Sequence, residues 1–395
     1  MNILVIHEVS YDSKVVYEYQ DFAERLAGRG HSVFVIDFDE TGECIGPPRS
    51  VSRTGVGTVR VFSTPCVNKP ILRFLTGRLL YPNFLRDFIR EHAISAIWMY
   101  SVFVNGEKTI EVAKSEGVPV IFRALDVYHQ VRQNPLIKYP LLLGEKFIYK
   151  NASHVSVTNL KMANYIRRVS KDCAEPSISV LSHGVDTQFF SPRQRDEEFS
   201  RRAGLKNESK VILFLGTLYP FSGLNHLLTA FHRHKSSHPN VKFVLVGDGE
   251  QEMLLRTLVT NLNLQDDVYF AGRAPYDEVP RWLSLADVTV TPFEINSITR
   301  DIVPIKSLQY LAMGKPLVSA PIPDVMSSIP QEVSGTFYQD ISDPESFLQK
   351  TMGIAENSTL SRNLGQKARE YVATHFSIDE TINKLEALIG STTTR

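Results

Sequence analysis

The second half of the chain contains a turn with the residue types of an anion-binding loop. Gly216 and Gly223 bound this turn, which follows the apolar run at 211–215. The sequence Gly223-Leu224-Asn225 predicts the opening of a helix. The amino end of a helix favours anions, because its dipole is positive there and its first amides have no partner within the helix. Backbone amides of such a turn can bind a negatively charged group.

A second glycine turn has two interpretations. Gly247 and Gly249 follow the apolar run at 241–246 and enclose Asp248. A glycine pair after a strand is typical of an ordinary turn into a helix. The alternative is a ligand-binding turn, because ligands of parallel sheets bind beyond the carboxyl ends of the strands.

Residues 69–90 combine basic and apolar side chains. Five basic residues stand against the single acidic residue Asp87, with leucines and phenylalanines between them. Such a basic amphipathic stretch can lie on an anionic membrane surface. The alternative is a helix that packs its apolar face on the domain core and leaves its arginines in water.

The composition excludes several classes of protein. Hydrophobic residues make up 43% and charged residues 22% of the 395 residues, as in a folded globular protein. Lys plus Arg and Asp plus Glu both number 43, so no overall charge favours nucleic acid as a partner. The three cysteines are an odd number without a CxxC motif, which argues against a disulfide framework and a structural zinc site.

The location predicted from the sequence is the cytoplasm. The cysteine usage fits a reducing compartment, and the amino terminus lacks the features of a signal peptide. No apolar run approaches the roughly 20 residues needed to cross a bilayer. We therefore expect a cytoplasmic protein, for which the basic stretch at 69–90 offers a contact with the inner face of the membrane.

The elements that position these residues have the pattern of α/β domains. Apolar runs alternate with helical segments, which indicates parallel sheets. In the first half, the predicted strands are 2–6, 33–37, 59–62, 94–98, 118–122, 154–158 and 178–181. In the second half, they are 211–215, 241–246, 268–270, 288–291, 316–319 and 336–338. Two such sheets in one chain predict a ligand cleft between two domains.

The length suits two domains of roughly 150 to 200 residues each. We expect the first at 1–187, the second at 188–375, and a carboxyl-terminal helix at about 376–390. In that helix Ile382, Leu385 and Ile389 share one face. The polar stretch at 191–210 contains Pro192 and no continuous apolar run, so we expect the interdomain linker there.

Five segments of the second half form an ordered series: 183–190, 246–249, 268–272, 286–292 and 304–318. They resemble the NGVD-to-F, VGDG, V-x-F-x-G, ADV-x-V-x-P and P-x-K-x-x-E-Y-x-A-x-G-K-P-V-V motifs of glycosyltransferase family four. In the first half, residues 28–33 resemble the RGH-x-V motif of the same family.

The resemblance implies two Rossmann-like domains facing across a cleft (the GT-B fold), with the last helix packed back on the first domain. It implies a retaining glycosyltransferase that moves a sugar from a nucleotide diphosphate sugar to a glycan, lipid-linked or small-molecule acceptor. The second domain would bind the nucleotide sugar, and the first would make most of the acceptor contacts. No metal or other cofactor is implied.

The family's hallmark is a pair of glutamates separated by seven residues, the first near the donor sugar and the second at the ribose. This chain has Asp301 and Gln309 at those positions. Asp301 keeps a carboxylate, which makes it a candidate catalytic residue, and Gln309 keeps an amide oxygen that can accept from a ribose hydroxyl. The alternative for Asp301 is a helix cap just before Pro304.

Thr217 and Ser222 stand where many family members carry Arg and Lys for the diphosphate. A diphosphate still needs charge-assisted hydrogen bonds. We expect them from Arg300 and Lys306, together with backbone amides of the turn at 216–223.

Three further residues are assigned by the resemblance. Gly247 would lie at the donor site, and Arg273 would lie where the chain meets the donor base. An exposed loop arginine is the alternative for Arg273. His183 replaces the usual asparagine of the linker motif, and we expect it to be structural rather than catalytic.

The acceptor-side catalytic group departs from the family pattern. Members often carry a histidine after the Pro-Val strand, whereas this chain has Ala124 or Leu125 there. Asp126, Arg123 and His129 are the available substitutes. We favour Asp126, which could bind a sugar hydroxyl or take a proton from the acceptor. A turn-forming aspartate is the alternative.

Two rival functions share the predicted fold. A nucleotide-sugar epimerase would need water and further carboxylates in the cleft. A degenerate, non-catalytic carbohydrate- or nucleotide-binding member would explain the replacements at Asp301 and Gln309. A dehydrogenase is disfavoured, because no GxGxxG follows the first strand of either half.

Overall fold

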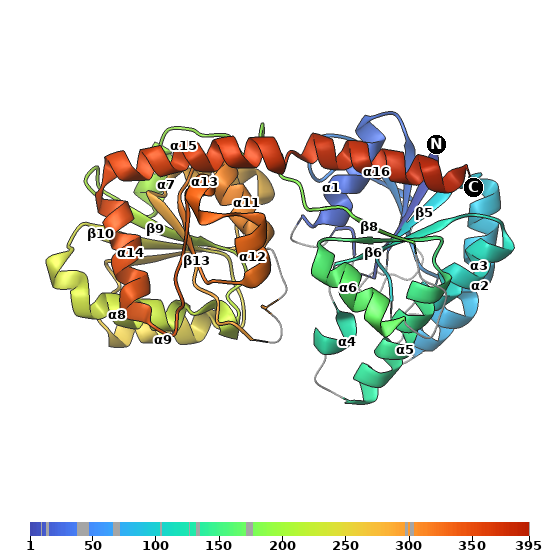
Figure 1. The fold of residues 1–395 in the computed structure, drawn as a ribbon, viewed down its shortest axis with the longest axis horizontal. Coiled ribbons are helices and arrows are strands. Elements are labelled where there is room, and N and C mark those ends of the chain that lie inside the picture. Colours follow the sequence, from blue (N-terminus) through green and yellow to red (C-terminus); the bar gives the residue numbers. More distant parts are fainter. Residues whose placement is uncertain are drawn as a thin grey trace. The chain divides into compact units, whose positions relative to one another are not determined.

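The computed structural model describes residues 1–8, 10–12, 16–37, 47–65, 72–102, 105–125, 127–131, 135–170, 177–296, 299–300 and 304–394. The chain divides into two compact units. Unit 1 comprises Met1–His183 and Glu380–Arg395, and unit 2 comprises Gly184–Asp379. Each unit has a sheet of its own (Figure 1). The two predicted catalytic residues, Asp126 and Asp301, lie outside the described residues.

Unit 1 is built on an eight-stranded sheet with the order β3-β4-β2-β1-β5-β6-β7-β8. Its pairs are parallel, except that β3 runs antiparallel to β4. The strands are β1 (Asn2–Ile6), β2 (Ser32–Asp37), β3 (Arg49–Val51), β4 (Val59–Ser63), β5 (Ala96–Met99), β6 (Val120–Ala124), β7 (His154–Val157) and β8 (Ile178–Val180). The central strands read as continuous apolar runs because both faces of a parallel sheet are buried.

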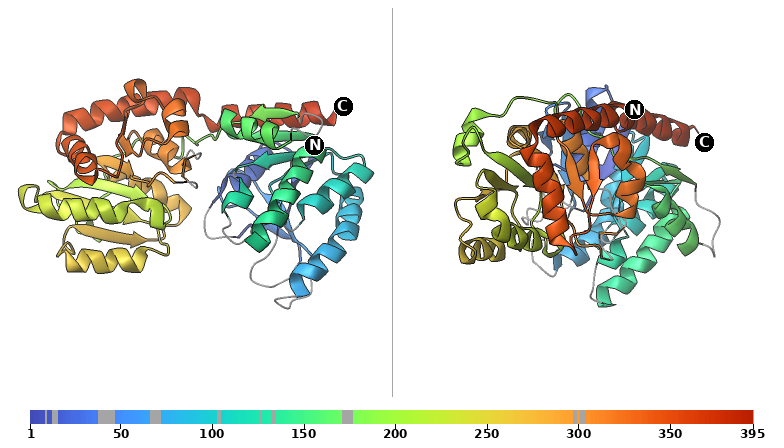
Figure 2. Two further views of the ribbon diagram at one scale, coloured as in Figure 1. Left: turned by 60° about the horizontal axis from the view of Figure 1, so that its bottom comes forward. Right: turned by 60° about the vertical axis from the view of Figure 1, so that its left-hand side comes forward.

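Helices cover both faces of this sheet (Figures 1 and 2). They are α1 (Glu18–Gly28), α2 (Leu72–Glu91), α3 (Gly106–Ser115), α4 (Tyr128–Val131), α5 (Pro135–Asn151), α6 (Leu160–Val169) and α16 (Ile378–Thr393). In α16, Ile382, Leu385 and Ile389 are fully buried, and Glu386 accepts a hydrogen bond from Arg29 at 2.6 Å. These contacts join the end of the chain to the same unit as its beginning.

Helix α2 resolves part of the question raised by the basic stretch. Tyr81, Leu85 and Phe88 are buried in the unit 1 core. Arg90 pairs with Glu116 at the end of α3 at 2.8 Å. The apolar face of α2 therefore packs on the domain core, as the second interpretation of residues 69–90 predicted.

Unit 2 has a six-stranded parallel sheet with the order β11-β10-β9-β12-β13-β14. Its strands are β9 (Lys210–Leu215), β10 (Val241–Val246), β11 (Val268–Gly272), β12 (Val288–Thr291), β13 (Leu317–Ser319) and β14 (Thr336–Tyr338). The first strand lies in the middle and the order reverses beside it, as in dinucleotide-binding Rossmann folds. The larger helices are α8 (Leu224–His234), α9 (Glu252–Asn261), α11 (Ile305–Ala312), α14 (Pro344–Glu356) and α15 (Ser358–His375).

The stretch predicted to be a linker, 191–210, belongs to unit 2 instead. It contains helix α7 (Glu197–Arg202), whose amino end is capped because the Asp196 side chain accepts from the Phe199 amide. Phe199 is fully buried and meets Trp282 edge-on, with ring centroids 4.6 Å apart. One well-placed aromatic residue anchors this polar segment, which a search for continuous apolar runs does not detect.

Every strand predicted from the sequence is present, with ends shifted by at most two residues. The missed strand is β3, a three-residue segment at the sheet edge that pairs only with β4 within the described part of the chain. Its sequence, Arg-Ser-Val, shows no apolar alternation, because an edge strand this short buries little surface.

Candidate functional site

The unit 2 sheet opens at its carboxyl edge between β9 and β12. Within the described residues these strands pair at only two positions, the last being Leu213 with Thr289. Beyond that point the Tyr310 hydroxyl of α11 accepts from the Leu215 amide at 2.7 Å and donates to the Leu215 carbonyl oxygen at 3.1 Å. Ligands of such sheets bind where the strand order reverses, at the carboxyl ends. This opening is therefore the candidate ligand site of unit 2. Sequence reasoning had given Tyr310 no role.

Two glycine turns meet at this opening. Gly216 and Gly247 have φ angles of 134° and 131°, in the region that favours glycine. A Cβ atom on Gly247 would collide with the carbonyl oxygen of Gly216, so the turns are in close contact. The Gly216 amide donates to Val246 at 2.8 Å and the Gly247 amide to Gly272 at 2.7 Å. Both amides therefore donate to backbone carbonyl oxygens and are not available to a ligand. Backbone amides that bind an anion must come from the other end of the 216–223 turn.

That far end is the start of α8. Gly223 precedes the helix with a φ of 66°, and a Cβ atom there would collide with the Pro292 carbonyl oxygen just after β12. Ser222 is buried beside it, whereas Thr217 is exposed. The predicted helix opening is confirmed, and it lies at the end of the strand that borders the sheet opening.

Lys306 brings a cation to the same place. Its side chain reaches Gly216, and its ammonium lies 4.6 Å from the ring centre of Phe214 and 5.0 Å from that of Phe293. Burial lowers the pKa of the ammonium to about 7. Among the described residues, no carboxylate is within ion-pair distance of it. The charge of Lys306 is therefore available to a ligand.

The other predicted donor residues are spread along the same edge. Gln309 follows Lys306 by about one turn of α11 and is half-buried. Arg300 is exposed in the loop after β12. Arg273, directly after β11, donates to both carboxylate oxygens of Asp248, with a shortest distance of 2.8 Å. Of the predicted donor residues, the structure brings Lys306 into contact with Gly216, and Gly216 with Gly247.

In unit 1, Arg123 is a buried structural residue and not a free substitute for Asp126. It donates to both carboxylate oxygens of Glu18 at 2.8 Å and to the Leu181 carbonyl oxygen at 2.7 Å. His183 also binds Glu18, through Nδ1 at 2.7 Å. Burial opposes ionisation of Glu18, but Arg123 and His183 hold the pKa of its carboxyl well below the usual range. These contacts support the structural interpretation of His183.

His129, the remaining substitute, pairs with Glu145 of α5, which sequence reasoning did not single out. Glu145 is fully buried. One of its oxygens lies 2.7 Å from His129 Nδ1, and the other accepts from the His129 backbone amide at 3.2 Å. Burial raises the pKa of Glu145, although the bonds from His129 act in the opposite direction. The available signal was a glutamate close behind the apolar run 141–143.

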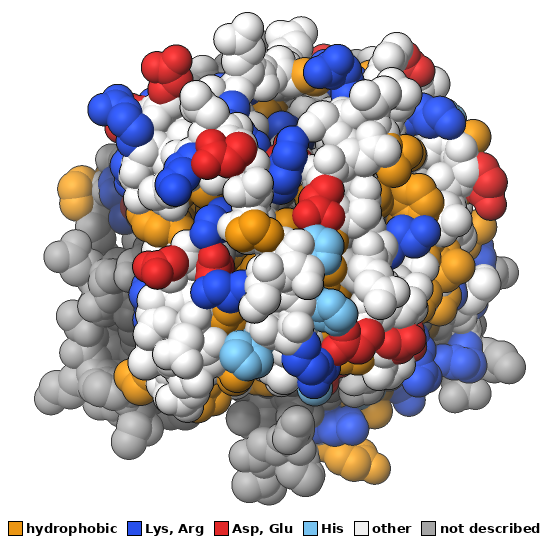
Figure 3. All heavy atoms as spheres, turned by 90° about the vertical axis from the view of Figure 1, so that its left-hand side faces the viewer, with side chains coloured by type: hydrophobic (Ala, Val, Ile, Leu, Met, Phe, Trp, Pro, Cys, Tyr) orange, Lys and Arg blue, Asp and Glu red, His pale blue; other side chains and the backbone are white. Residues whose placement is uncertain are grey.

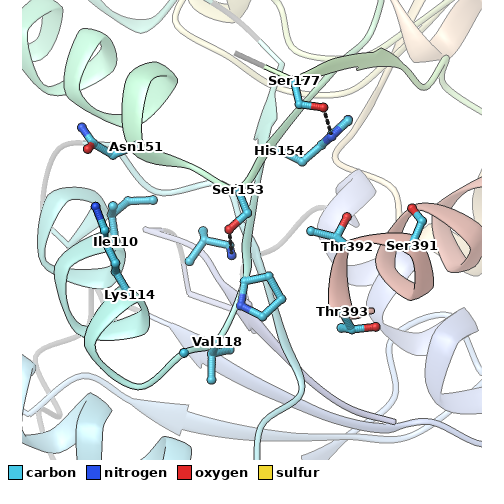
Figure 4. A pocket seen from close by; sticks show the side chains of 13 residues that line it. Ile110, Lys114, Val118, Asn151, Ser153, His154, Ser177, Ser391, Thr392 and Thr393 are labelled. Carbon is cyan, nitrogen blue, oxygen red and sulfur yellow. Dashed lines mark hydrogen bonds between the residues drawn. The ribbon is translucent and has the colours of Figure 1, made fainter. Parts of the chain in front are cut away.

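A pocket of about 460 Å³ lies at the opposite, amino edge of the unit 1 sheet (Figure 4). Its lining includes Ser153, His154 and Ser177, together with residues 391–393 at the end of α16. His154 is fixed by Ser177, with 2.9 Å between Nδ1 and Oγ. No predicted site residue lines this pocket, so we assign the functional site to the carboxyl edges.

The face drawn in Figure 3 shows no strong preference for a polyanion. On the face in Figure 3, basic and acidic side chains are mixed, without a large patch of either sign. Within the described part of the chain, no group of three His, Cys, Asp or Glu residues is placed to hold a metal ion. Over the same residues, every helix is too short or too polar to cross a bilayer.

Comparison with known proteins gives matches over most of the chain. Residues 19–189 match the family described as Glycosyltransferase Family 4, and residues 195–371 match Glycosyl transferases group 1. The putative glycosyltransferase YtcC of Bacillus subtilis is 26% identical over 56% of each chain. The alpha-monoglucosyldiacylglycerol synthase of Streptococcus pneumoniae is 22% identical over 96% of this chain and 84% of that one.

The first two curated relatives are matched over 56% and 40% of their own length, so the chain spans about half of them. Among solved structures, Anabaena HepE in complex with UDP-glucose superposes with a TM-score of 0.76 and 16% identity. That superposition covers 99% of this chain and 100% of HepE.

The two sheets and these matches define a chain of the GT-B fold class, with two Rossmann-like domains. The chain belongs to glycosyltransferase family four. The predicted family and fold class are thereby confirmed.

Proposed function

We propose that this glycosyltransferase moves a sugar from a nucleotide diphosphate sugar to an acceptor hydroxyl, with the donor bound by unit 2 and most of the acceptor by unit 1. The observation that carries the proposal is Lys306. It is a cation at the sheet opening, beside Gly216, with no carboxylate partner among the described residues. A diphosphate at this place would form charge-assisted hydrogen bonds with Lys306 and with the first amides of α8. Together they replace the Arg and Lys that many family members carry at Thr217 and Ser222.

The remaining donor contacts are those that the family resemblance implies. Gln309, about one turn beyond Lys306, would accept from the ribose, and Asp301 would contact the transferred sugar. Arg300 would add charge near the diphosphate, and Arg273 would meet the base. The fold shared with HepE, which was solved with UDP-glucose, supports a nucleotide sugar as donor. We further propose that transfer retains the anomeric configuration and needs no metal ion, as the family resemblance implies.

We also propose a glycan or lipid-linked acceptor, met at the cytoplasmic face of a membrane. Leu79 and Leu80 of α2 have exposed fractions of 71% and 48%, and Tyr139 and Leu143 of α5 have 70% and 62%. Exposed apolar side chains among basic residues suit an interface with anionic lipid. One relative is named alpha-monoglucosyldiacylglycerol synthase, which supports a lipid-linked acceptor.

These exposed residues come from neighbouring helices. Arg78 of α2 pairs with Glu107 of α3 at 2.8 Å. A Cβ atom on Gly144 of α5 would lie 3.9 Å from the same Glu107 carboxylate. The exposed parts of α2 and α5 therefore adjoin across the start of α3, and one lipid surface could meet both.

A panel of nucleotide sugars tests the enzymatic proposal. The full chain is mixed with UDP-glucose, UDP-N-acetylglucosamine, GDP-mannose and ADP-glucose, and its melting temperature and the released nucleoside diphosphate are measured. We expect at least one donor to raise the melting temperature and to release its diphosphate. Conversion of a donor to an isomeric sugar would identify an epimerase, and no shift with any donor would favour a degenerate member.

Vesicle binding tests the membrane proposal. The full chain should sediment with phosphatidylglycerol vesicles and not with phosphatidylcholine vesicles. Leu79→Ser combined with Leu143→Ser should abolish sedimentation. Met253→Ser is the matched control, because Met253 is 79% exposed on α9 of unit 2. Equal binding of the double variant and the wild type would refute this surface.

A further inference from the structure

The buried pair of His129 and Glu145 has the geometry of an oriented acid–base group. Both carboxylate oxygens of Glu145 face His129, one at its backbone amide and the other at Nδ1. This double contact fixes the ring and leaves Nε2 directed away from the carboxylate. Among the described residues Nε2 has no hydrogen-bond partner, and 9% of the side-chain surface stays exposed. A histidine held in this way presents one nitrogen to a ligand.

The pair lies at the ligand-binding edge of unit 1. Helix α4, which carries His129, follows the carboxyl end of β6 at Ala124. Ligands of a parallel sheet bind beyond these strand ends. The strand end itself offers Ala124 and Leu125, whose side chains cannot transfer a proton. After β6, Tyr128 directs its hydroxyl to the Tyr100 carbonyl oxygen at 3.5 Å, and His129 is the first described residue with a basic side-chain nitrogen.

The surroundings of the pair contain incomplete hydrogen bonds. The His129 ring lies nearly parallel to that of Tyr165 of α6, with centroids 6.4 Å apart. The buried hydroxyls of Tyr165 and Tyr149 have no partner among the described residues. Buried hydroxyls are rarely left without a partner in folded proteins. The two hydroxyls beside Glu145 therefore indicate a polar site whose hydrogen bonds are not all made by the described protein groups.

The charged and titratable groups packed around His129 come from three helices. Besides Glu145 and Tyr149 of α5, they are Tyr128 of α4 and, on α6, Tyr165 with Arg168 over its ring at 5.8 Å. Glu145 is the carboxylate among them that bonds the ring directly. Glu145 is therefore the direct charged partner of the His129 ring.

We propose that His129 is the proton acceptor for the attacking hydroxyl in the transfer reaction and that Glu145 is its positioning residue. The proposal rests on the proposed function, in which the acceptor binds at this edge. It assigns the role predicted for Asp126 to a histidine that is oriented by a buried carboxylate. General-base catalysis of this kind contributes about 10²- to 10⁴-fold to a rate.

The step balances without any further reactant. The acceptor O–H bond breaks, its proton moves to His129 Nε2, and its electron pair forms the new bond to the anomeric carbon on the face from which the phosphate departs, as the proposed retention of configuration requires. The bond from that carbon to the phosphate oxygen breaks, and its electron pair leaves with the nucleoside diphosphate. Glu145 stabilises the resulting imidazolium through Nδ1, as carboxylates do for histidine bases. When no acceptor is present, a water molecule takes its place and the donor is hydrolysed.

Donor hydrolysis provides the test, since water can serve as the acceptor. The full-length wild type, His129→Gln, Glu145→Gln and His154→Gln are compared for release of nucleoside diphosphate from the four nucleotide sugars named above. His154→Gln is the matched control, because it is the same substitution in the same unit at the amino edge (Figure 4). Melting temperature and nucleotide affinity of each variant show whether it is folded.

We expect kcat to fall at least about 100-fold in His129→Gln and about 10-fold or more in Glu145→Gln, with nucleotide affinity unchanged. His154→Gln should stay within about twofold of the wild type. The acidic limb of the wild-type profile of kcat against pH should disappear in His129→Gln, and imidazole should partly restore His129→Gly. If the pair of His129 and Glu145 were only structural, the acidic limb would remain in His129→Gln and imidazole would not restore His129→Gly.

The failures are distinguishable. If the wild type releases no diphosphate from any nucleotide sugar, the proposed function fails, and the role of His129 fails with it. If the wild type is active and a folded His129→Gln keeps its rate and pH profile, only the role of His129 is overturned. If His129→Gln does not fold, Glu145→Gln decides by the same readouts.

Discussion

The binding of a nucleotide sugar should depend on pH through one lysine. The ammonium of Lys306 has a pKa of about 7, because it is buried against aromatic rings and has no carboxylate partner among the described residues. About half of it is therefore charged at pH 7, and about one tenth at pH 8. A diphosphate beside the ammonium favours the charged form and raises this pKa towards the ordinary value. Binding must then take up a proton wherever the free lysine is neutral.

The size of the pH effect follows from the pKa of Lys306 in the free protein and its pKa when the diphosphate is bound. If the diphosphate restores a pKa of about 10.4, binding at pH 8 takes up about 0.9 proton, and the dissociation constant rises about 25-fold between pH 6.5 and 8.5. UDP-glucose is the suitable probe, because its diphosphate is esterified at both ends and lacks the second ionisation of a phosphate monoester near pH 6. If UDP-glucose does not bind, the nucleotide sugar with the largest thermal shift takes its place.

Titration calorimetry of the full chain measures this effect. The dissociation constant is determined from pH 6.5 to 8.5 in two buffers of different ionisation enthalpy, so that proton uptake appears as a difference in heat. Lys306→Arg is the control, because a guanidinium stays charged throughout this range. Its affinity should vary much less with pH. A wild-type dissociation constant that is the same at both ends of the range, or an equal slope in Lys306→Arg, would refute the reasoning.

The other predictions concern the same edge of unit 2. Lys306→Met should stabilise the free protein at pH 7 by about 1 kcal/mol, because it removes a buried unpaired charge. The melting temperature should rise accordingly, and a value below that of the wild type would contradict this. Tyr310→Phe should lower the free energy of unfolding in urea by about 1 to 3 kcal/mol, since it leaves the Leu215 amide and carbonyl without the hydroxyl; unchanged stability would show that other groups satisfy them. Asp301→Ala should reduce transfer strongly yet leave binding of the sugarless nucleotide nearly intact, and full transfer activity would favour the helix-cap alternative. Gln309→Ala should weaken nucleotide binding measured by calorimetry, and Gln309→Glu should weaken it too, because it adds a negative charge near the diphosphate; tighter binding of the glutamate variant would count against this. Diphosphate release should persist in excess EDTA, and its loss would show that a metal ion is required.

Most of the fold could be predicted from the sequence. Strands such as β1 and β10 are apolar runs bounded by turn residues, and that signal is local. The VGDG motif placed Gly247 at the carboxyl end of a strand, and the apolar run at 211–215 did the same for the turn from Gly216 to Gly223. Polar segments were the exception, since the linker prediction at 191–210 overlooked a helix anchored by Phe199.

The site was only partly predictable. Lys306 was a candidate from the sequence, but its contact with Gly216 and the rings that lower its pKa depend on how α11 packs beside β9. The same packing places the Tyr310 hydroxyl where β9 and β12 separate. No local pattern reports the distance between residues that are far apart in the chain.

By itself, the sequence determined the α/β class and the family, because periodicity and motif order are properties of neighbouring residues. Only the tertiary structure decided which charged groups are paired. Arg123 was a candidate until its guanidinium was found on Glu18, and His129 gained its role from Glu145 on another helix. Whether a buried charge is paired depends on distances across the core, and these are set when helices pack on the sheet and not by spacing along the chain.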